Sequence, residues 1–290
     1  MKRIFAGDRV TAWAGVVLLT MFALAVFVPI FARQDPLAIG DVLALRLIPP
    51  FGHDPGGSLH VLGTDRFGRD LFVRMMLAAR ISLAIGVGGS LLAAALGTMA
   101  GALAAWLGGT IDRVTMAIAD ALLAIPRLVL LLVCASLWQP GLITVLMVLG
   151  ATGWMGVARI IRGEILGVRA RPFVEAAHAL GVSHWQVLWR HVLPNSIGPA
   201  IVATTLGVGN AILLESGLSF LGLGIQPPRP SWGNMIAGGR DLIVSAPWVA
   251  LAPGIALIIT VLAVTLLGDR LRDALAGQRV PFARQLAERT

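Results

Sequence analysis

The stretch ISLAIGVGGSLLAAALGTMAGALAAWLGGTI, residues 81–111, contains no charged side chain. A helix needs ~20 consecutive apolar residues to span the ~30 Å hydrocarbon layer of a bilayer, and this stretch exceeds that length. Residues 10–32, 128–158 and 242–268 form three further runs of the same kind. Over the whole chain 57% of residues are hydrophobic, 13% are charged and the mean hydropathy is +0.84. These values predict an all-α membrane protein that crosses the bilayer several times.

Six segments have the length and apolarity of transmembrane helices. They cover about residues 11–32, 81–107, 113–137, 142–162, 196–221 and 246–268. The chain therefore divides into an N-terminal helix (1–35), an outer segment (36–80), a five-helix core (81–268) with a long inward loop (163–195), and a C-terminal tail (269–290). Residues 10–32 are too long for the apolar part of a cleaved signal peptide, so we expect the first helix to be retained.

Two features within these segments predict local geometry. Ala93, Gly97, Gly101 and Ala105 recur at four-residue spacing. This spacing places small residues on one stripe and lets another helix of the same chain approach closely. Pro126 lies inside the third segment, where its ring blocks a backbone hydrogen bond, so we expect a kink there.

The distribution of arginine predicts the orientation of the bundle. The formal net charge is +8, and Lys2 is the only lysine. With the N-terminus in the cytoplasm, the inner segments hold fourteen basic residues and the outer segments hold eight. This bias follows the positive-inside rule. We therefore expect both termini and residues 163–195 in the cytoplasm, and residues 33–80 outside.

Residues 171–195, RPFVEAAHALGVSHWQVLWRHVLPN, form a polar, helix-forming island between apolar runs. Pro172 suits the first turn of a helix, and Gly181 suits a left-handed residue that ends it. Ser183 and Gln186 have the spacing of a capping box that starts a second helix. Pro194 is expected to end that second helix. The pattern predicts a short helix, a glycine bend and another helix.

The first of these short helices has a small apolar face. Phe173, Ala176, Ala177 and Leu180 form it, with Glu175 beside it. A protruding knob of this kind fits a groove on another protein. An amphipathic helix that lies on the inner leaflet is the alternative.

Two carboxylates, Asp120 and Glu215, lie within the predicted spans. An ionised group in lipid is costly, so each should face the protein interior, a partner or a water-filled path. Together with Asn210 they are candidates for the lining of a translocation path. A structural polar contact with a paired subunit is the alternative. Arg127 follows Asp120 by seven residues, which would place it on the same helix face, two turns away.

Several classes of chemistry lack their motifs. A P-loop needs a lysine in a glycine-rich loop, and Lys2 has no such surroundings, so ATP and Mg²⁺ would bind to separate subunits. No His-Glu-x-x-His occurs, and all five histidines lie outside the predicted spans. Ser216 therefore has no histidine base there. The histidines at 178, 184 and 191 fit a docking surface better than a metal site, and Cys134 has no partner for a disulfide. We expect this chain to bind no cofactor or metal and to catalyse no reaction.

The 171–195 island resembles the "EAA" loop of binding-protein-dependent ABC permeases. The resemblance lies in Glu175-Ala176-Ala177, Gly181 and Leu193-Pro194, while His191 stands where the broad superfamily has isoleucine. Other blocks resemble the dipeptide/oligopeptide/nickel branch of that family. They are Leu62-Gly63-Thr64-Asp65 with Gly68-Arg69-Asp70, Leu218-Ser219-Phe220-Leu221-Gly222-Leu223-Gly224, Pro227-Pro228-Arg229-Pro230-Ser231-Trp232-Gly233, and Gly268-Asp269 with Leu271-Arg272-Asp273. The resemblance covers about residues 60–275, and the first helix suits the second, or C-type, permease of that branch.

This resemblance implies a type I ABC importer permease fold in the bacterial inner membrane. The chain would pair with a second (B-type) permease, two ATP-binding subunits and an extracytoplasmic substrate-binding protein. Dipeptides, oligopeptides, glutathione and nickel complexes are all compatible cargoes. The surface that couples to the ATP-binding subunits would comprise Glu175, Ala176, Ala177 and Gly181 by resemblance, and Phe173 and Leu180 by their place on the apolar face.

The outer side of the protein carries two further candidates. Residues 60–80 have the arginines and apolar residues of an interfacial amphipathic helix. In the proline-rich loop 226–232, Arg229 and Trp232 are candidates for contact with the binding protein, and an interfacial anchor is the alternative for Trp232. Two rival functions remain. One is a self-sufficient secondary transporter or channel driven by an ion gradient through Asp120 or Glu215, and the other is a scaffold without a transport path.

Overall fold

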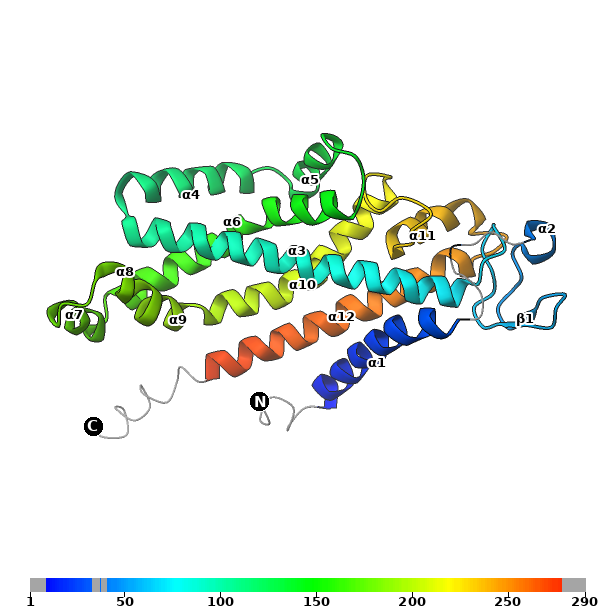
Figure 1. Cartoon of the computed structure of the whole chain (residues 1–290), viewed down its shortest axis with the longest axis horizontal. Coiled ribbons are helices and arrows are strands. Elements are labelled where there is room, and N and C mark those ends of the chain that lie inside the picture. The colour runs from blue at the N-terminus through cyan, green and yellow to red at the C-terminus, as the bar shows by residue number, and fades with distance from the viewer. Residues whose placement is uncertain (1–8, 33–36, 38–40, 278–290) are drawn as a thin grey trace.

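The computed structural model describes residues 9–32, 37 and 41–277. In this part the chain is an elongated bundle whose long helices lie along its longest axis (Figure 1). Five of its helices are long and apolar enough to cross a membrane. They are α1 (Arg9–Phe31), α3 (Leu71–Leu107), α6 (Leu142–Arg169), α10 (Gly198–Phe220) and α12 (Trp248–Gly277). The all-α membrane fold and five of the six predicted spans are therefore confirmed.

The sixth predicted span, 113–137, is broken. α4 (Gly109–Leu123) and α5 (Arg127–Ser136) meet at an angle of 94°, and Pro126 precedes α5 as its N-cap residue. Proline has no backbone N–H and its ring clashes with the preceding turn, so a helix does not continue straight through it. The predicted kink is confirmed, and it is sharp enough to separate the span into two helices.

Three predicted boundaries are wrong because helices extend past their apolar runs. α3 begins at Leu71, where the Asp70 side chain accepts a 2.9 Å hydrogen bond from the backbone N–H of Val73. Residues 71–80 are therefore the first turns of α3 and not a separate interfacial helix. Further along α3, Arg80 donates to the backbone carbonyls of α1, which satisfies a charge inside the bundle. α6 and α12 likewise continue to residues 169 and 277, beyond the predicted ends at 162 and 268.

The small-residue stripe of α3 packs against α6, as predicted. A Cβ at Gly97 would lie 2.5 Å from the carbonyl oxygen of Trp154, and a Cβ at Gly101 would come closer still to that of Ala158. Any side chain at either position would push the two helices apart. The stripe therefore serves packing within the chain.

One end of the bundle, here called the hairpin end, comprises residues 42–70 and 225–247. It holds α2 (Val42–Leu45), the antiparallel strands β1 (Gly52–His53) and β2 (Leu59–His60), α11 (Trp232–Gly239) and the 3₁₀ helix η2 (Arg240–Leu242). His60 Nδ1 lies 2.7 Å from Asp70 Oδ2, and Asp65 binds Arg69 at 2.7 Å. These polar contacts fix the segment that leads into α3.

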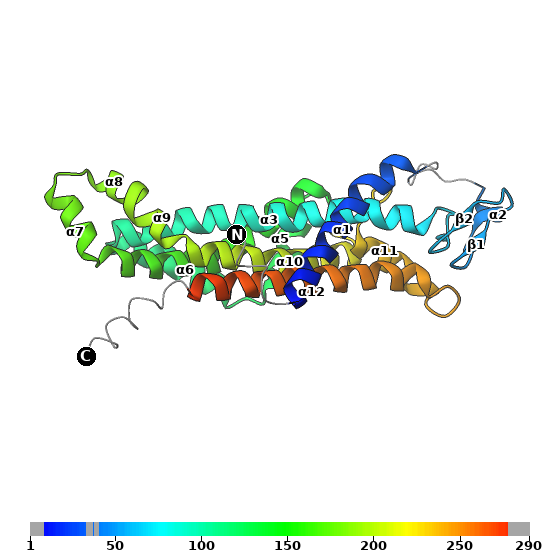
Figure 2. The same cartoon turned by 90° about the horizontal axis from the view of Figure 1, so that it is seen from below.

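The opposite end, here called the α7 end, comprises residues 163–197 (Figure 2). After α6 it contains α7 (Pro172–Ala179), α8 (His184–Val187), the π-helix η1 (Leu188–Val192) and α9 (Leu193–Ser196). Pro194 was expected to end the second short helix, but it lies in the first turn of α9, where its missing N–H costs nothing. The wider π turn that precedes it lets the helical path continue to Ser196.

Three apolar clusters follow one another along the bundle and hold its helices together. The cluster at the α7 end contains Trp106, Ile161, Ile165, Val174, Leu188 and Val192. The middle cluster contains Ile85, Leu131, Leu149 and Leu218. The cluster towards the hairpin end contains Leu71, Met76, Ile212 and Trp232.

Candidate functional site

The bend after α7 is closed by backbone hydrogen bonds that need a left-handed residue. Gly181 has a φ of +78°. The N–H of Val182 donates to the carbonyl of Ala177 at 3.1 Å, and the N–H of Gly181 donates to that of His178 at 3.0 Å. These two bonds define a Schellman motif, for which glycine is the preferred residue. The predicted glycine bend is confirmed, and Ser183 caps α8 by accepting from the N–H of Gln186.

One residue of the predicted apolar face of α7, Ala177, lies partly inside the protein. Val174 is buried, and Ala177 packs partly buried against the same apolar cluster. Ala177 therefore contacts its own chain on one side and is partly exposed on the other, and it stays a predicted coupling residue. Phe173 is 41% exposed and Leu180 is 84% exposed, and Glu175 and Ala176 are exposed beside them. A solvent-facing patch of Phe173, Glu175, Ala176 and Leu180 remains.

Aromatic and imidazole rings pack together between α3, α7 and α8. This contact was not predicted from the sequence. The indole of Trp106, at the end of α3, lies 4.3 Å from the ring of His184 and 6.5 Å from that of His178, measured between centroids. Arg169 lies over the same indole at 5.4 Å. Burial, and then the nearby His178 and Arg169, lower the pKa of His184. His184 packs against the Trp106 ring in this group.

Glu215 lies inside the protein and is held by hydroxyl groups. Its side chain is 0% exposed. Ser219 Oγ donates to Oε1 at 2.7 Å, and Ser82 Oγ donates to Oε2 at 2.9 Å. The same Ser82 oxygen accepts from the backbone N–H of Trp232 at 3.4 Å. This arrangement, here called the Glu215 knot, ties α10 to α3 and α11.

Asp120 lies in a more exposed environment than Glu215. It forms an ion pair with Arg159 of α6, with Nε at 2.9 Å from Oδ1. The two side chains are 55% and 51% exposed. Arg127 does not share a face with Asp120, because the bend at Pro126 separates them. Both carboxylates therefore have polar partners. Glu215 is paired inside the protein, and Asp120 is paired on the exposed face of α4 and α6.

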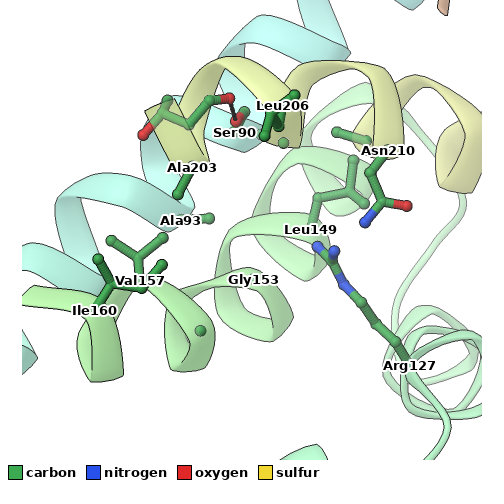
Figure 3. A pocket seen from close by; sticks show the side chains of 15 residues that line it. Ser90, Ala93, Arg127, Leu149, Gly153, Val157, Ile160, Ala203, Leu206 and Asn210 are labelled. Atoms are coloured by element: carbon green, nitrogen blue, oxygen red, sulfur yellow. Dashed lines mark hydrogen bonds between the residues drawn. The ribbon is translucent and has the colours of Figure 1, made fainter. Parts of the chain in front are cut away.

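A cavity of about 300 Å³ lies between α3, α5, α6 and α10, near the middle of the bundle. Arg127 and Asn210 line it, together with Ser90, Gly153 and Gly156. Figure 3 shows the Arg127 guanidinium reaching from α5 towards the same space as the Asn210 amide. Asn210 therefore keeps its candidate place on a path. Glu215 and Asp120 do not line this cavity.

The predicted outer contact at Trp232 needs correction. Its indole is 0% exposed and belongs to the apolar cluster towards the hairpin end, so it neither meets a binding protein nor anchors to lipid in this structure. Ser231 and Asn234 form a capping box that fixes this segment. Arg229 is exposed and remains a predicted contact. In the part of the chain that the structure describes, no group of three metal-binding side chains comes together.

Comparisons with known proteins agree with this architecture. Residues 95–279 match the family model described as "Binding-protein-dependent transport system inner membrane component". A putative peptide permease protein of Brucella suis biovar 1 is 41% identical over 263 residues, covering 90% of this chain and 84% of that protein. The glutathione transport system permease protein GsiD of Pectobacterium atrosepticum is 36% identical, covering 94% and 88%. The probable D,D-dipeptide transport system permease protein DdpC of Escherichia coli K12 is 36% identical, covering 93% and 88%.

A solved structure with a similar fold is a chain of the MetNI methionine ABC transporter in inward-facing form. The TM-score is 0.57 at 19% sequence identity, and the match covers 71% of this chain and 96% of that one. At this identity the match concerns the fold alone.

Proposed function

Because this chain belongs to the family of binding-protein-dependent transport system inner membrane components, as a permease of the dipeptide/oligopeptide ABC importers, we propose that it imports peptides or a related small solute. Its relatives are named for peptides, glutathione and D,D-dipeptides. Glutathione is itself a peptide, so a peptide backbone with a free carboxylate is the shared chemistry. The secondary transporter and the scaffold are not favoured by this family membership.

The proposed complex contains this chain, a second permease, two ATP-binding subunits and an extracytoplasmic binding protein. ATP and Mg²⁺ would bind to the partner subunits. The exposed patch on α7 supports this proposal most directly. A helix that stands at one end of an apolar bundle and exposes Phe173 and Leu180 to solvent leaves apolar area for a partner to cover.

The proposed mechanism is alternating access. Closure of the ATP-binding subunits would move α7, and the movement would pass through α6 to the cavity near the middle of the bundle. Substrate delivered at the hairpin end would then be released at the α7 end. Selection among cargoes would lie mostly with the binding protein.

We propose that both termini and the α7 end face the cytoplasm. The excess of basic residues in the inner segments supports this orientation. Single cysteines introduced on a Cys134→Ser background and labelled with an impermeant reagent will test it. Position 53 should label in intact cells and position 178 only after lysis, and labelling at 178 in intact cells would reverse the assignment.

If the α7 end couples to the ATP-binding subunits, a charge reversal in its exposed patch should reduce uptake. Glu175→Lys reverses a charge within the exposed patch, and desolvated interface charges commonly cost about 2–5 kcal/mol when a partner is lost. We expect uptake to fall at least about tenfold, because ~1.4 kcal/mol corresponds to a factor of ten. Asp273→Lys is the matched control, since it makes the same charge reversal at an exposed position of α12, outside α7 and the 171–195 island.

The Schellman bend provides a second, independent pair of variants. Gly181→Val places a β-branched residue at a φ of +78°, which costs about 1–3 kcal/mol, whereas Gly181→Asn is tolerated in such bends. The assay is uptake and ATPase activity in reconstituted complexes. Normal uptake by both Glu175→Lys and Gly181→Val, with the ATP-binding subunits retained, would show that this end does not couple.

Copurification separates the proposal from its rivals. The tagged chain should bring a second permease and ATP-binding subunits from detergent extracts, and uptake should require ATP. Uptake by the isolated chain under an ion gradient, without ATP-binding subunits, would support the secondary transporter instead.

A further inference from the structure

The cavity near the middle of the bundle contains a cationic group that no described residue neutralises. Arg127 is half-buried, and its Nε is fully buried with no hydrogen-bond partner among the described residues. Within the part of the chain that the structure describes, the side chains that line the cavity include no carboxylate. A buried guanidinium N–H without an acceptor is costly, so this position favours an occupant that supplies an acceptor.

The local fold aims Arg127 into the cavity. It is the first residue of α5, directly after the bend at Pro126, and it reaches across α6 at Gly153. A Cβ at Gly153 would lie 3.1 Å from Nη2 of Arg127 and 2.7 Å from Cβ of Ala93. The absence of a side chain at Gly153 therefore makes room for the guanidinium.

A second polar group faces the same space. Asn210 lines the cavity from α10 and is exposed to it, and Figure 3 shows its amide directed towards the region that Arg127 enters. The hydroxyls of Ser90 and Thr204, in contrast, are already bonded to backbone carbonyls at 2.6 and 2.7 Å. The groups left for a ligand are thus one guanidinium and one amide.

We propose that Arg127 and Asn210 form a carboxylate-binding subsite in the translocation path. A guanidinium presents a fork of N–H donors that matches both oxygens of a carboxylate, and the amide N–H₂ adds a donor. The C-terminal carboxylate of a peptide fits this chemistry, and this assignment rests on the proposed function. The size of the cavity suits the end of a peptide and excludes a large cargo from lodging there whole.

The charge at this subsite can be measured without transport. A cysteine placed at 210 on the Cys134→Ser background should react faster with an anionic methanethiosulfonate (sulfonatoethyl) than with a cationic one (trimethylammonioethyl). Relative to the same cysteine with Arg127→Gln, the ratio of the two rates should be larger on the order of tenfold. Arg113→Gln, an exposed arginine of α4 outside the cavity, should leave the ratio unchanged.

Two results of this labelling would overturn the proposal. Equal ratios with and without the Arg127→Gln substitution would show that the guanidinium does not govern the cavity. Failure of both reagents to reach position 210, in nucleotide-free and in ATP-bound complexes alike, would show that the cavity is not on a water path. Gly156→Leu should block the reaction, because Gly156 lines the cavity with open space around it, whereas Gly163→Leu on the same helix should not.

Uptake of dialanine by the reconstituted complex gives the functional test. Arg127→Gln should reduce uptake at least about fivefold, as expected for loss of a charge-assisted bidentate contact, with Arg127→Lys between the two. Stimulation of ATPase activity by the loaded binding protein should persist, since Arg127 begins α5, which lies far from α7 (Figure 1). Equal uptake by wild type and Arg127→Gln would overturn the subsite and leave the proposed function intact. Absence of uptake by wild type would instead contradict the proposed cargo, while the labelling at 210 would still decide the subsite.

Discussion

Glu215 and Asp120 are the two acidic side chains that the sequence placed in predicted spans, and the protein treats them in opposite ways. Glu215 is fully enclosed and is held by serine hydroxyls from two helices. Asp120 lies more than half exposed on α4 and is paired with Arg159. The first arrangement binds helices of the chain to one another, and the second covers a charge on a face that the chain itself leaves open. A carboxylate in an apolar segment therefore predicts a polar partner, but it does not predict whether that partner is a buried hydroxyl or an exposed arginine.

The face that carries Asp120 extends along α4. Ala119 is the only buried residue of that helix, and a second ion pair, between Asp112 and Arg162, lies nearer the α7 end. Both pairs join α4 to α6. We expect the outer face of α4 to be covered by the second permease, because an uncovered polar strip in lipid would be costly.

The strongest test of this contrast is removal of the enclosed carboxylate. Glu215→Ala leaves the hydroxyls of Ser82 and Ser219 without their acceptor, and each such group costs about 1–3 kcal/mol. We expect the largest drop in thermal unfolding midpoint of any variant considered, with Glu215→Gln in between because it keeps one acceptor oxygen. Asp120→Ala is the matched control and should shift the midpoint little. Equal shifts of the unfolding midpoint for the two alanine variants would show that the enclosed and the exposed carboxylate contribute equally to stability.

A smaller effect is expected from one member of the Glu215 knot. Ser219 donates to Glu215 and also accepts from the backbone N–H of Ile225 at 3.0 Å. Ser219→Ala leaves that N–H without an acceptor, at about 1–3 kcal/mol, while Ser82 still donates to Glu215. Ser136→Ala serves as the control, because Ser136 is exposed and donates to the carbonyl of Val133 in its own helix. Melting of the purified complex compares the two.

The smallest effect is expected at the exposed ion pair. A double-mutant cycle of Asp120→Asn and Arg159→Gln should give a coupling energy of about 0.2–1 kcal/mol, which decreases in high salt. The Asp112–Arg162 pair is less exposed and should give a larger and less salt-sensitive value. A coupling at Asp120 that exceeds the cost of Ser219→Ala would mean that α4 depends on this pair for its position.

The sequence predicted features that depend on local chemistry. Apolar runs indicated the helices, Pro126 indicated the break, and Gly181 indicated the left-handed bend, because each of these acts on the backbone around it. The four-residue spacing of Glu215 and Ser219, which places them on one helical face, was not used, although it could have indicated one contact of the Glu215 knot.

Contacts between segments that are far apart in the sequence could not be predicted, because local patterns do not specify how helices pack. Ser82 reaches Glu215 from another helix, Trp106 supports α7 from the end of α3, and Trp232 turns inward although it follows a proline-rich loop. The break at Pro126 also invalidated the periodicity that placed Arg127 on the same helix face as Asp120, since a helical repeat holds only while the helix is continuous. The roles of these residues depend on the packing of the helices.

The unbroken course of α6 has a mechanical consequence. The helix is continuous from Gly153, against which Arg127 rests, to Arg169, just before α7 begins, and its rise of ~1.5 Å per residue makes this arm about 24 Å long. A tilt of about 10° at one end of such an arm displaces the other by about 4 Å, most of the rise of one helical turn. Under the proposed mechanism α6 would serve as a lever, and a small displacement at α7 would open or close a space the size of a side chain around Arg127.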